Sequence, residues 1–106
     1  MLHIYATAID VVRRLVPVIR SIERRDRDLA RQLRRAAASV VLNISEGSGS
    51  SGGTRTERYR NALGSARETT ACLDCATAFG YVSALDDELL DALDRVRATL
   101  VKVAAR

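Results

Sequence analysis

Apolar residues recur at every third or fourth position along four separate segments of this chain, and this period constrains the fold more than any other feature. In the first two segments the recurring residues are Ile4, Ala8, Val11, Leu15, Val18 and Ile22, then Leu29, Leu33, Ala36, Val40 and Ile44. In the last two they are Tyr59, Leu63, Ala66, Thr70, Leu73 and Ala76, then Leu89, Leu93, Val96, Leu100 and Val103. This spacing places side chains on one face of an α-helix. The sequence therefore predicts four amphipathic helices and an all-α fold.

The helices are expected at about residues 3–24, 27–46, 56–79 and 84–105, within one domain that covers residues 1–106. Tight connections after the first and third helices favour antiparallel neighbours, and hence an up-down-up-down four-helix bundle. Pro17 lies inside the first helix and should kink it without dividing it. Asp26 or Asp28 can cap the second helix.

The end of the third helix and the start of the fourth carry their own signals. Gly80 is a residue type favoured just past a helix C-terminus. Ser83, with Asp86 three residues later, resembles a capping box for the fourth helix. We therefore expect a short turn between these two helices.

Residues 47–54 read GSGSSGGT, and we expect Gly47 to end the second helix and the segment to form a flexible loop. The segment also fits the G-x-G-x-x-G pattern of dinucleotide-binding folds, with the β-prone residues 40–44 before it. The helical period continues through residues 40–44, however, and no further strands follow. No lysine follows the glycines to hold a phosphate, so we reject nucleotide binding here.

Catalytic and metal-binding patterns are not found in the sequence. The single histidine, His3, cannot supply a triad or a metal cluster, and Glu46, Glu68 and Asp74 are scattered along the chain. We therefore expect no enzymatic activity, no metal and no cofactor. The N-terminus lacks the features of a signal peptide and no segment is apolar enough to span a membrane, which favours a soluble protein of the cytoplasm.

Cys72 and Cys75 lie three residues apart, on one face of the third predicted helix. Two thiols cannot complete a zinc site on their own. The pair is interpreted as small buried side chains in a reducing compartment, with a redox or metal-binding pair as the alternative.

Two stretches resemble the signatures of a known bacterial family, the 23S rRNA intervening-sequence proteins. The first is Gln32–Ala37 followed by Ser39-Val40 and by residues 43–47, Asn-Ile-Ser-Glu-Gly. The second comprises Tyr59 and residues 62–68, Ala-Leu-Gly-Ser-Ala-x-Glu. The match covers residues 29–80 well and extends more loosely to the first and last helices. On this resemblance we expect an antiparallel four-helix bundle that assembles as a homopentamer.

The same resemblance implies partners. Relatives of the family act as accessory proteins of diversity-generating retroelements, which bind a reverse transcriptase and nucleic acid through a basic surface. Here the loop between the second and third helices carries no charge before Arg55, unlike the family pattern. This departure weakens any role of that loop in holding phosphate.

The signature residues with a predicted structural role are Asn43, Glu46, Gly47, Gly64, Ser65 and Glu68. Asn43 and Glu46 are expected to bond to free groups of the adjoining turn and to hold the second and third helices in register. Gly64 suggests a place where another helix comes close, from this chain or from another subunit. A binding role for Asn43 and Glu46 is the alternative.

Positive charge is concentrated near the N-terminus. Residues 1–35 contain nine arginines against four acidic residues, whereas the whole chain has a net charge of +4. The arginines predicted to form a basic face on the first two helices are Arg13, Arg20, Arg24, Arg27, Arg31, Arg34 and Arg35. No aromatic residue interleaves with them, so we expect neither base stacking nor sequence readout.

Two functions follow from these observations. The first is a non-enzymatic nucleic-acid-binding or ribonucleoprotein accessory scaffold, in which the arginines meet phosphates of RNA or DNA. The second is a structural or protein-interaction oligomer whose charge serves solubility. A component of a toxin–antitoxin or defence system is a third, minor reading.

Overall fold

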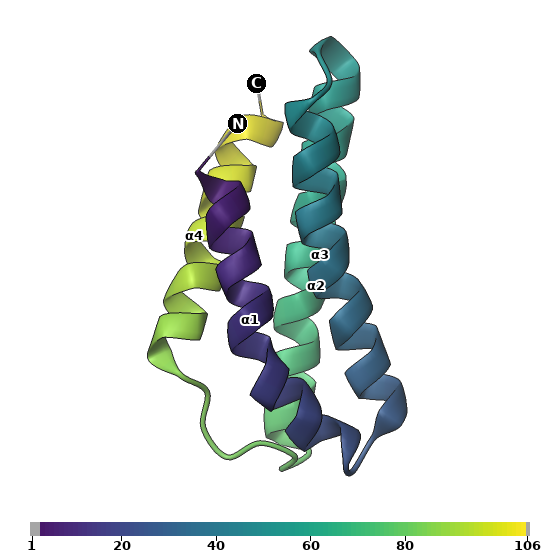
Figure 1. Cartoon of the computed structure of the whole chain (residues 1–106), viewed down its shortest axis with the longest axis vertical. Helices are drawn as coiled ribbons and strands as arrows, with labels where there is room; N and C mark the ends of the chain where they lie inside the picture. The colour runs from purple at the N-terminus through teal and green to yellow at the C-terminus, as the bar shows by residue number, and fades with distance from the viewer. Residues whose placement is uncertain (1–2, 106) are drawn as a thin grey trace.

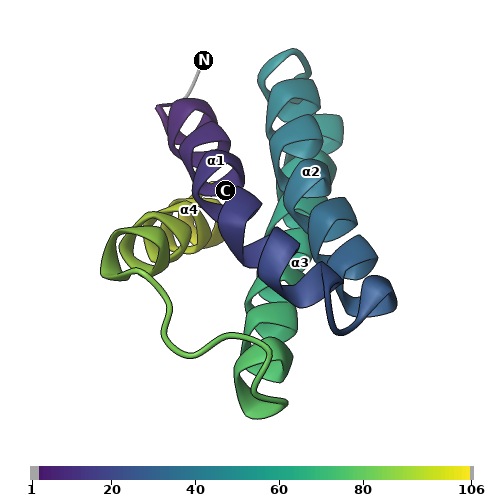
Figure 2. The ribbon, with the colours of Figure 1, turned by 60° about the horizontal axis from the view of Figure 1, so that its bottom comes forward.

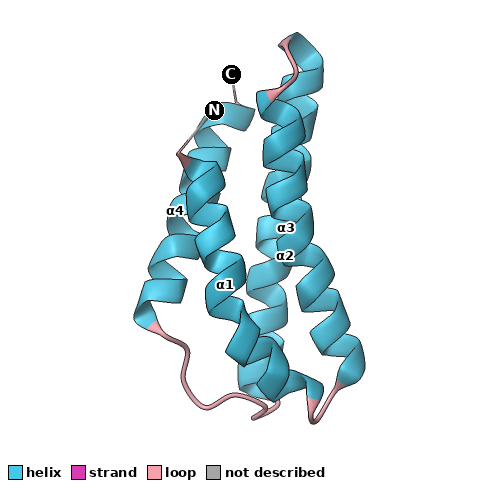
Figure 3. Cartoon of the chain, in the orientation of Figure 1, coloured by secondary structure: helices cyan, strands magenta, loops and turns pink. Residues whose placement is uncertain are grey.

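The computed structural model describes residues 3–105, and over this range the chain is all-α with no strand. The four helices are α1 (Ile4–Glu23), α2 (Arg27–Ser48), α3 (Gly52–Ala78) and α4 (Asp87–Ala104), as Figures 1 and 3 show. Residues 40–44 lie inside α2 and do not form a strand. The helical interpretation of this segment is therefore correct, and the phosphate-loop pattern has no strand before it.

The helices pack as a compact bundle in which each has two principal neighbours. α1 lies against α2 and α4, and α3 lies against the same two helices, with the most extensive contact between α2 and α3. The molecule measures 43 × 24 × 19 Å. Figure 2 shows α3 passing behind α2, with the long connection running from the end of α3 across to the start of α4.

Aliphatic side chains from all four helices fill the core. The largest apolar ones that are fully buried are Leu15, Ile22, Leu33, Ile44, Leu73, Leu89, Val96 and Leu100. In α4 all the apolar residues of the predicted period are buried. We call such a row of regularly spaced apolar residues the seam of its helix. The apolar period of the sequence thus identifies most of the core.

Four positions of the predicted seams were wrong by one residue. Ile19 is buried where Val18 was predicted, and Ala30 where Leu29 was predicted; Val18 and Leu29 are only partly buried. In α3, Ala62 and Thr69 are buried, while Leu63 is partly buried and Thr70 is exposed. Apolar residues spaced alternately three and four apart repeat every 3.5 residues on average, whereas a helix has 3.6 residues per turn. Over several turns the predicted apolar face therefore drifts, and adjacent residues at its edge are hard to tell apart.

The glycine-rich segment is mostly helical, which contradicts the predicted flexible loop. α2 continues to Ser48 and α3 begins at Gly52, so only three residues connect them. Gly47 does not end α2 but is buried inside it, opposite the ring of Tyr59. Tertiary packing at this point overrides the low helix propensity of glycine.

The α3–α4 connection, residues 79–86, is longer than the predicted turn. Gly80 has φ +78°, and the Tyr81 N–H donates to the Ala76 carbonyl at 2.9 Å, which is a Schellman ending for α3. The predicted capping box at Ser83 is wrong, because Asp86 is the N-cap and accepts a hydrogen bond from the Glu88 N–H at 3.2 Å.

The first two helices join through a short turn. α1 runs without interruption through Pro17, and Asp26 caps α2 by accepting a hydrogen bond from the Leu29 N–H at 2.9 Å. α1 and α2 therefore bring the arginine-rich part of the chain to one end of the bundle.

Candidate functional site

The seven arginines of the predicted basic face are all exposed and lie on α1, on the turn after it and on α2. We call them the arginine surface: Arg13, Arg20, Arg24, Arg27, Arg31, Arg34 and Arg35. The Arg34 guanidinium of α2 lies 3.5 Å from the Glu23 carboxylate of α1. This ion pair connects the two helices beside the turn. Arg13 lies seven residues before Arg20, about 10 Å further along α1.

Most of this charge is not neutralised within the chain. Arg34 pairs with Glu23, and Arg31 lies 4.0 Å from Asp28 with both side chains largely exposed. The other arginines of the surface form no ion pair with any residue between 3 and 105; they are Arg13, Arg20, Arg24, Arg27 and Arg35. The two pairs that do form are exposed, and exposed pairs contribute little to stability.

Three residues beside the arginine surface were missed in the sequence. Arg25 lies over the ring of Tyr81, with 5.6 Å from the guanidinium carbon to the ring centroid. Phe79 stacks on Tyr81, with ring centroids 5.3 Å apart. No aromatic interleaves with the seven arginines along the sequence, but the α3–α4 connection folds back onto the α1–α2 turn and brings this aromatic pair beside Arg25. The one feature of the sequence that pointed to this pair is that two of the four aromatic residues of the chain lie on either side of Gly80, where α3 was predicted to end.

The Tyr81 ring is held in place from several sides. The Ser21 hydroxyl donates a hydrogen bond to the Tyr81 carbonyl oxygen at 3.1 Å. Partial removal from water and a hydrogen bond with the Asp26 carboxylate raise the pKa of the Tyr81 phenol above its ordinary value. The ring is thus fixed against the α1–α2 turn.

Signature residues connect α2 with α3. The Ser65 hydroxyl donates to the Ser39 hydroxyl at 2.7 Å, and the Asn43 amide donates to the Ser39 carbonyl and hydroxyl oxygens at 2.9 and 3.1 Å. Glu46 pairs with Arg58 of α3 at 2.9 Å. The side chains of Asn43 and Glu46 do not bond to the turn as predicted, because α2 continues past both and these side chains contact helical residues instead.

The remaining signature residues occupy contrasting positions. A Cβ atom on Gly47 would lie 2.6 Å from the ring of Tyr59, so a side chain does not fit there. Gly64 is exposed, and a Cβ atom there would meet nothing within 4 Å. Among residues 3–105, therefore, no other helix comes close to Gly64. Glu68 is exposed and lies near enough to Cys72 to affect its titration.

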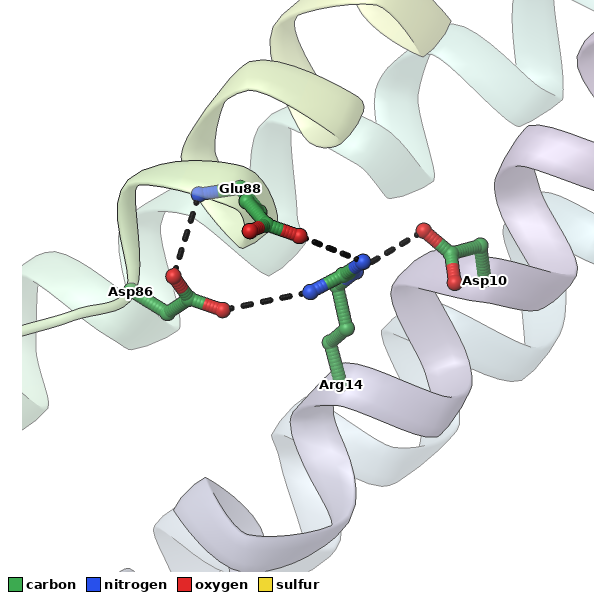
Figure 4. Close-up of polar contacts among 4 residues, drawn as sticks. All are labelled: Asp10, Arg14, Asp86 and Glu88. Atoms are coloured by element: carbon green, nitrogen blue, oxygen red, sulfur yellow. Dashed lines mark hydrogen bonds and ion pairs between the residues drawn. The ribbon is translucent and has the colours of Figure 1, made fainter.

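Arg14 joins α1 to the start of α4, as Figure 4 shows. Its guanidinium pairs with Asp10 at 2.9 Å, with Asp86 at 3.2 Å and with Glu88 at 2.8 Å. The hydrogen bond with Asp10 is the largest of the effects that raise the pKa of Arg14. Arg14 therefore forms three ion pairs within the chain, whereas each arginine of the arginine surface forms one or none.

The two cysteines differ in environment. Cys72 is buried as predicted, but Cys75 is exposed, so the interpretation of both as buried side chains is wrong for Cys75. Desolvation raises the pKa of the Cys72 thiol, and the negative charges of Glu68 and Cys75 add to the effect. Because the thiolate is the reactive form, this shift disfavours the redox interpretation of the pair.

Two surface hollows accompany the bundle. A groove of about 250 Å³ runs between α3 and α4, with Leu73, Leu90 and Leu93 in its wall and the Arg97–Asp94 pair at its edge. A second hollow of about 300 Å³ lies between the start of α1 and Arg95 of α4. Across residues 3–105, no group of three or more candidate ligands could hold a metal ion. None of the helices in this range is long and apolar enough to cross a membrane.

Comparison with known proteins agrees with the fold and with the signatures. A comparison with curated proteins finds no match. The crystal structure of a protein of unknown function from the S23 ribosomal protein family of Bacteroides thetaiotaomicron VPI-5482 has a similar fold, with a TM-score of 0.82 and 15% identity over 97% of this chain and 99% of that one. The family model described as 23S rRNA-intervening sequence protein matches residues 1–102. The chain therefore belongs to the family of 23S rRNA-intervening sequence proteins.

Proposed function

We propose that this protein is a non-enzymatic, oligomeric scaffold that binds nucleic acid through the arginine surface. The observation that carries the proposal is the set of exposed arginines around one turn that have no carboxylate partner in the described part of the chain. A guanidinium without a partner is free to bind phosphate oxygens, often through two hydrogen bonds at once.

The assembly that fits this proposal is a homopentamer of up-down-up-down bundles. The up-down-up-down topology is supported by the three-residue connections between α1 and α2 and between α2 and α3, which favour antiparallel neighbours. Five copies of the arginine surface would add their fields and attract a polyanion more strongly than one copy. We place the protein in the cytoplasm, with RNA or DNA and a reverse transcriptase as candidate partners.

Charge-matched variants test the proposal. In Arg20→Ala/Arg27→Ala, two unpaired arginines of the arginine surface are removed; in Arg60→Ala/Arg95→Ala, two exposed arginines elsewhere are removed, with the same change in net charge. We expect the first variant to bind a mixed-sequence RNA strand more weakly and to lower the slope of log affinity against log salt by about 1 to 2. The second variant should bind almost as the wild type does.

Equal losses in both variants would mean that only net charge attracts the strand. No measurable binding by the wild type at low salt would remove the proposal altogether. Circular dichroism should give the same helix content for all three proteins, because the substituted side chains are exposed.

A second candidate function is a structural or protein-interaction oligomer. Val16 of α1 and Leu42 of α2 favour it, since these large apolar residues are 40% and 60% exposed. The variant Val16→Ser/Leu42→Ser separates the two functions. Dissociation of the oligomer with unchanged nucleic-acid affinity would assign these residues to subunit contacts alone.

A further inference from the structure

The α3–α4 connection carries an exposed pair of aromatic rings at the arginine-rich end of the bundle. Phe79 is the last residue before Gly80, whose left-handed backbone (φ +78°) turns the chain so that Phe79 and Tyr81 stack. The ring planes are 23° apart. Phe79 remains 65% exposed, the most exposed of the large apolar residues in the described range.

The pair is fixed before any ligand arrives. Tyr81 is held by the Ser21 hydroxyl on its carbonyl oxygen at 3.1 Å and by the Arg25 guanidinium over its ring. Phe79 in turn rests against Tyr81. Because the stack on Tyr81 already restricts the Phe79 ring, a planar group that stacks on Phe79 would have less side-chain freedom to remove.

Positively charged side chains lie on the turn beside the rings, where Arg25 is over Tyr81 and the Asp26 carboxylate also lies near the phenol. Arg24, Arg25 and Arg27 are exposed on the same turn, and none of them forms an ion pair with a residue between 3 and 105. Aromatic faces that accept bases, next to guanidinium groups that accept phosphates, are the combination by which proteins hold unpaired nucleotides.

We infer that Phe79, supported by Tyr81, is a stacking platform for an unpaired base of a single-stranded nucleic acid, whose neighbouring phosphates are bound by Arg24, Arg25 and Arg27. This inference rests on the proposed nucleic-acid function and gives it a substrate class. In a duplex the bases are already stacked on one another and are not available to the Phe79 ring. The protein should therefore prefer single strands to duplexes of the same sequence.

The test uses a 12-nucleotide strand that carries the fluorescent base 2-aminopurine, prepared as RNA and as DNA. Stacking of one base on an aromatic ring corresponds to about a 5- to 100-fold change in affinity. We expect Phe79→Ala to weaken binding by this factor and to abolish the change in 2-aminopurine fluorescence, and Phe79→Trp to retain both. Val101→Ala is the control, because it removes another exposed apolar side chain, from α4.

Several results would overturn the platform. If Phe79→Ala binds as the wild type does while Arg20→Ala/Arg27→Ala binds weakly, the platform is refuted and the proposed function stands. If the wild type binds no strand at low salt, both fail. Equal affinity for duplex and single strand, full affinity of Phe79→Leu, or a change in oligomer size caused by Phe79→Ala would each refute stacking. The RNA and DNA probes then identify which backbone the site prefers.

Discussion

At the scale of single residues, two glycines with the same helical conformation have opposite surroundings. Gly47 faces the ring of Tyr59, and an added Cβ atom would lie 2.6 Å from it. Tyr59 is 5% exposed and belongs to the hydrophobic core. Gly64 faces open space. The family signature thus contains one glycine that packing within the chain requires and one that it does not.

Substitution of Gly47 by alanine is expected to destabilise the protein. The added methyl group would have to displace a buried ring, and overpacking of this kind costs about 1–3 kcal/mol. Thermal or urea unfolding of Gly47→Ala measures the loss. An unchanged free energy of unfolding would show that Tyr59 can move aside without loss of packing.

Gly64→Ala is the matched control and carries a prediction of its own. Because the site is open, alanine should raise the stability of the separate subunit by up to about 1 kcal/mol through its higher helix propensity. If another subunit packs against Gly64 in the oligomer, the same change should promote dissociation. Unfolding and light scattering together distinguish the two effects.

Cys72 should be less reactive than Cys75. The raised pKa of Cys72 leaves less of the reactive thiolate at a given pH. The same shift means that the Cys72 thiol stabilises the fold below the pKa of an unfolded thiol. This stabilisation is lost as the pH rises through the pKa of the folded state. In iodoacetamide at pH 8, mass spectrometry should find Cys75 modified first, and similar rates at both thiols in denaturant. Faster modification of Cys72 in the folded protein would contradict this account.

At the scale of helices, Arg14 secures the beginning of α4. The long α3–α4 connection leaves α4 without a tight turn to hold it, and the pairs from Arg14 to Asp86 and Glu88 tie its first turn to α1. Asp86 is also the N-cap of α4. One guanidinium therefore orients the residues that start this helix.

Arg14→Met keeps the aliphatic part of the side chain and removes the ion pairs. We expect a lower melting temperature, and faster amide hydrogen exchange in the first turn of α4 than elsewhere in the bundle. High salt should lower the melting temperature of the wild type toward that of the variant, because salt screens these ion pairs. Arg97→Met is the control, since Arg97 pairs only within α4.

The sequence predicts the helices better than the connections between them. The seam of α4 is correct throughout, because leucine and valine at regular spacing have one apolar face. The end of α2 and the start of α3 were not predicted, because glycine usually ends a helix, whereas here Gly47 packs against Tyr59 inside α2 and α3 begins at Gly52. The arginine surface was found from charge alone. Phe79 was missed, because its neighbour Arg25 lies far away in the sequence and only the tertiary fold brings the α1–α2 turn to Tyr81.

At the scale of the whole molecule, the proposed homopentamer predicts a particle of five chain masses in solution. Multi-angle light scattering at micromolar concentration measures this mass directly. A monomer at that concentration would remove the pentamer, and each bundle would then present its arginines alone.

The central claim is that the arginines around the α1–α2 turn bind phosphate. The measurement that tests it most directly is the affinity of the wild-type protein for a single-stranded RNA across salt concentrations from about 50 to 200 mM. We predict binding at low salt, with log affinity falling linearly against log salt as counterions are released. No binding at the lowest salt, or an affinity that does not change with salt, would contradict the claim.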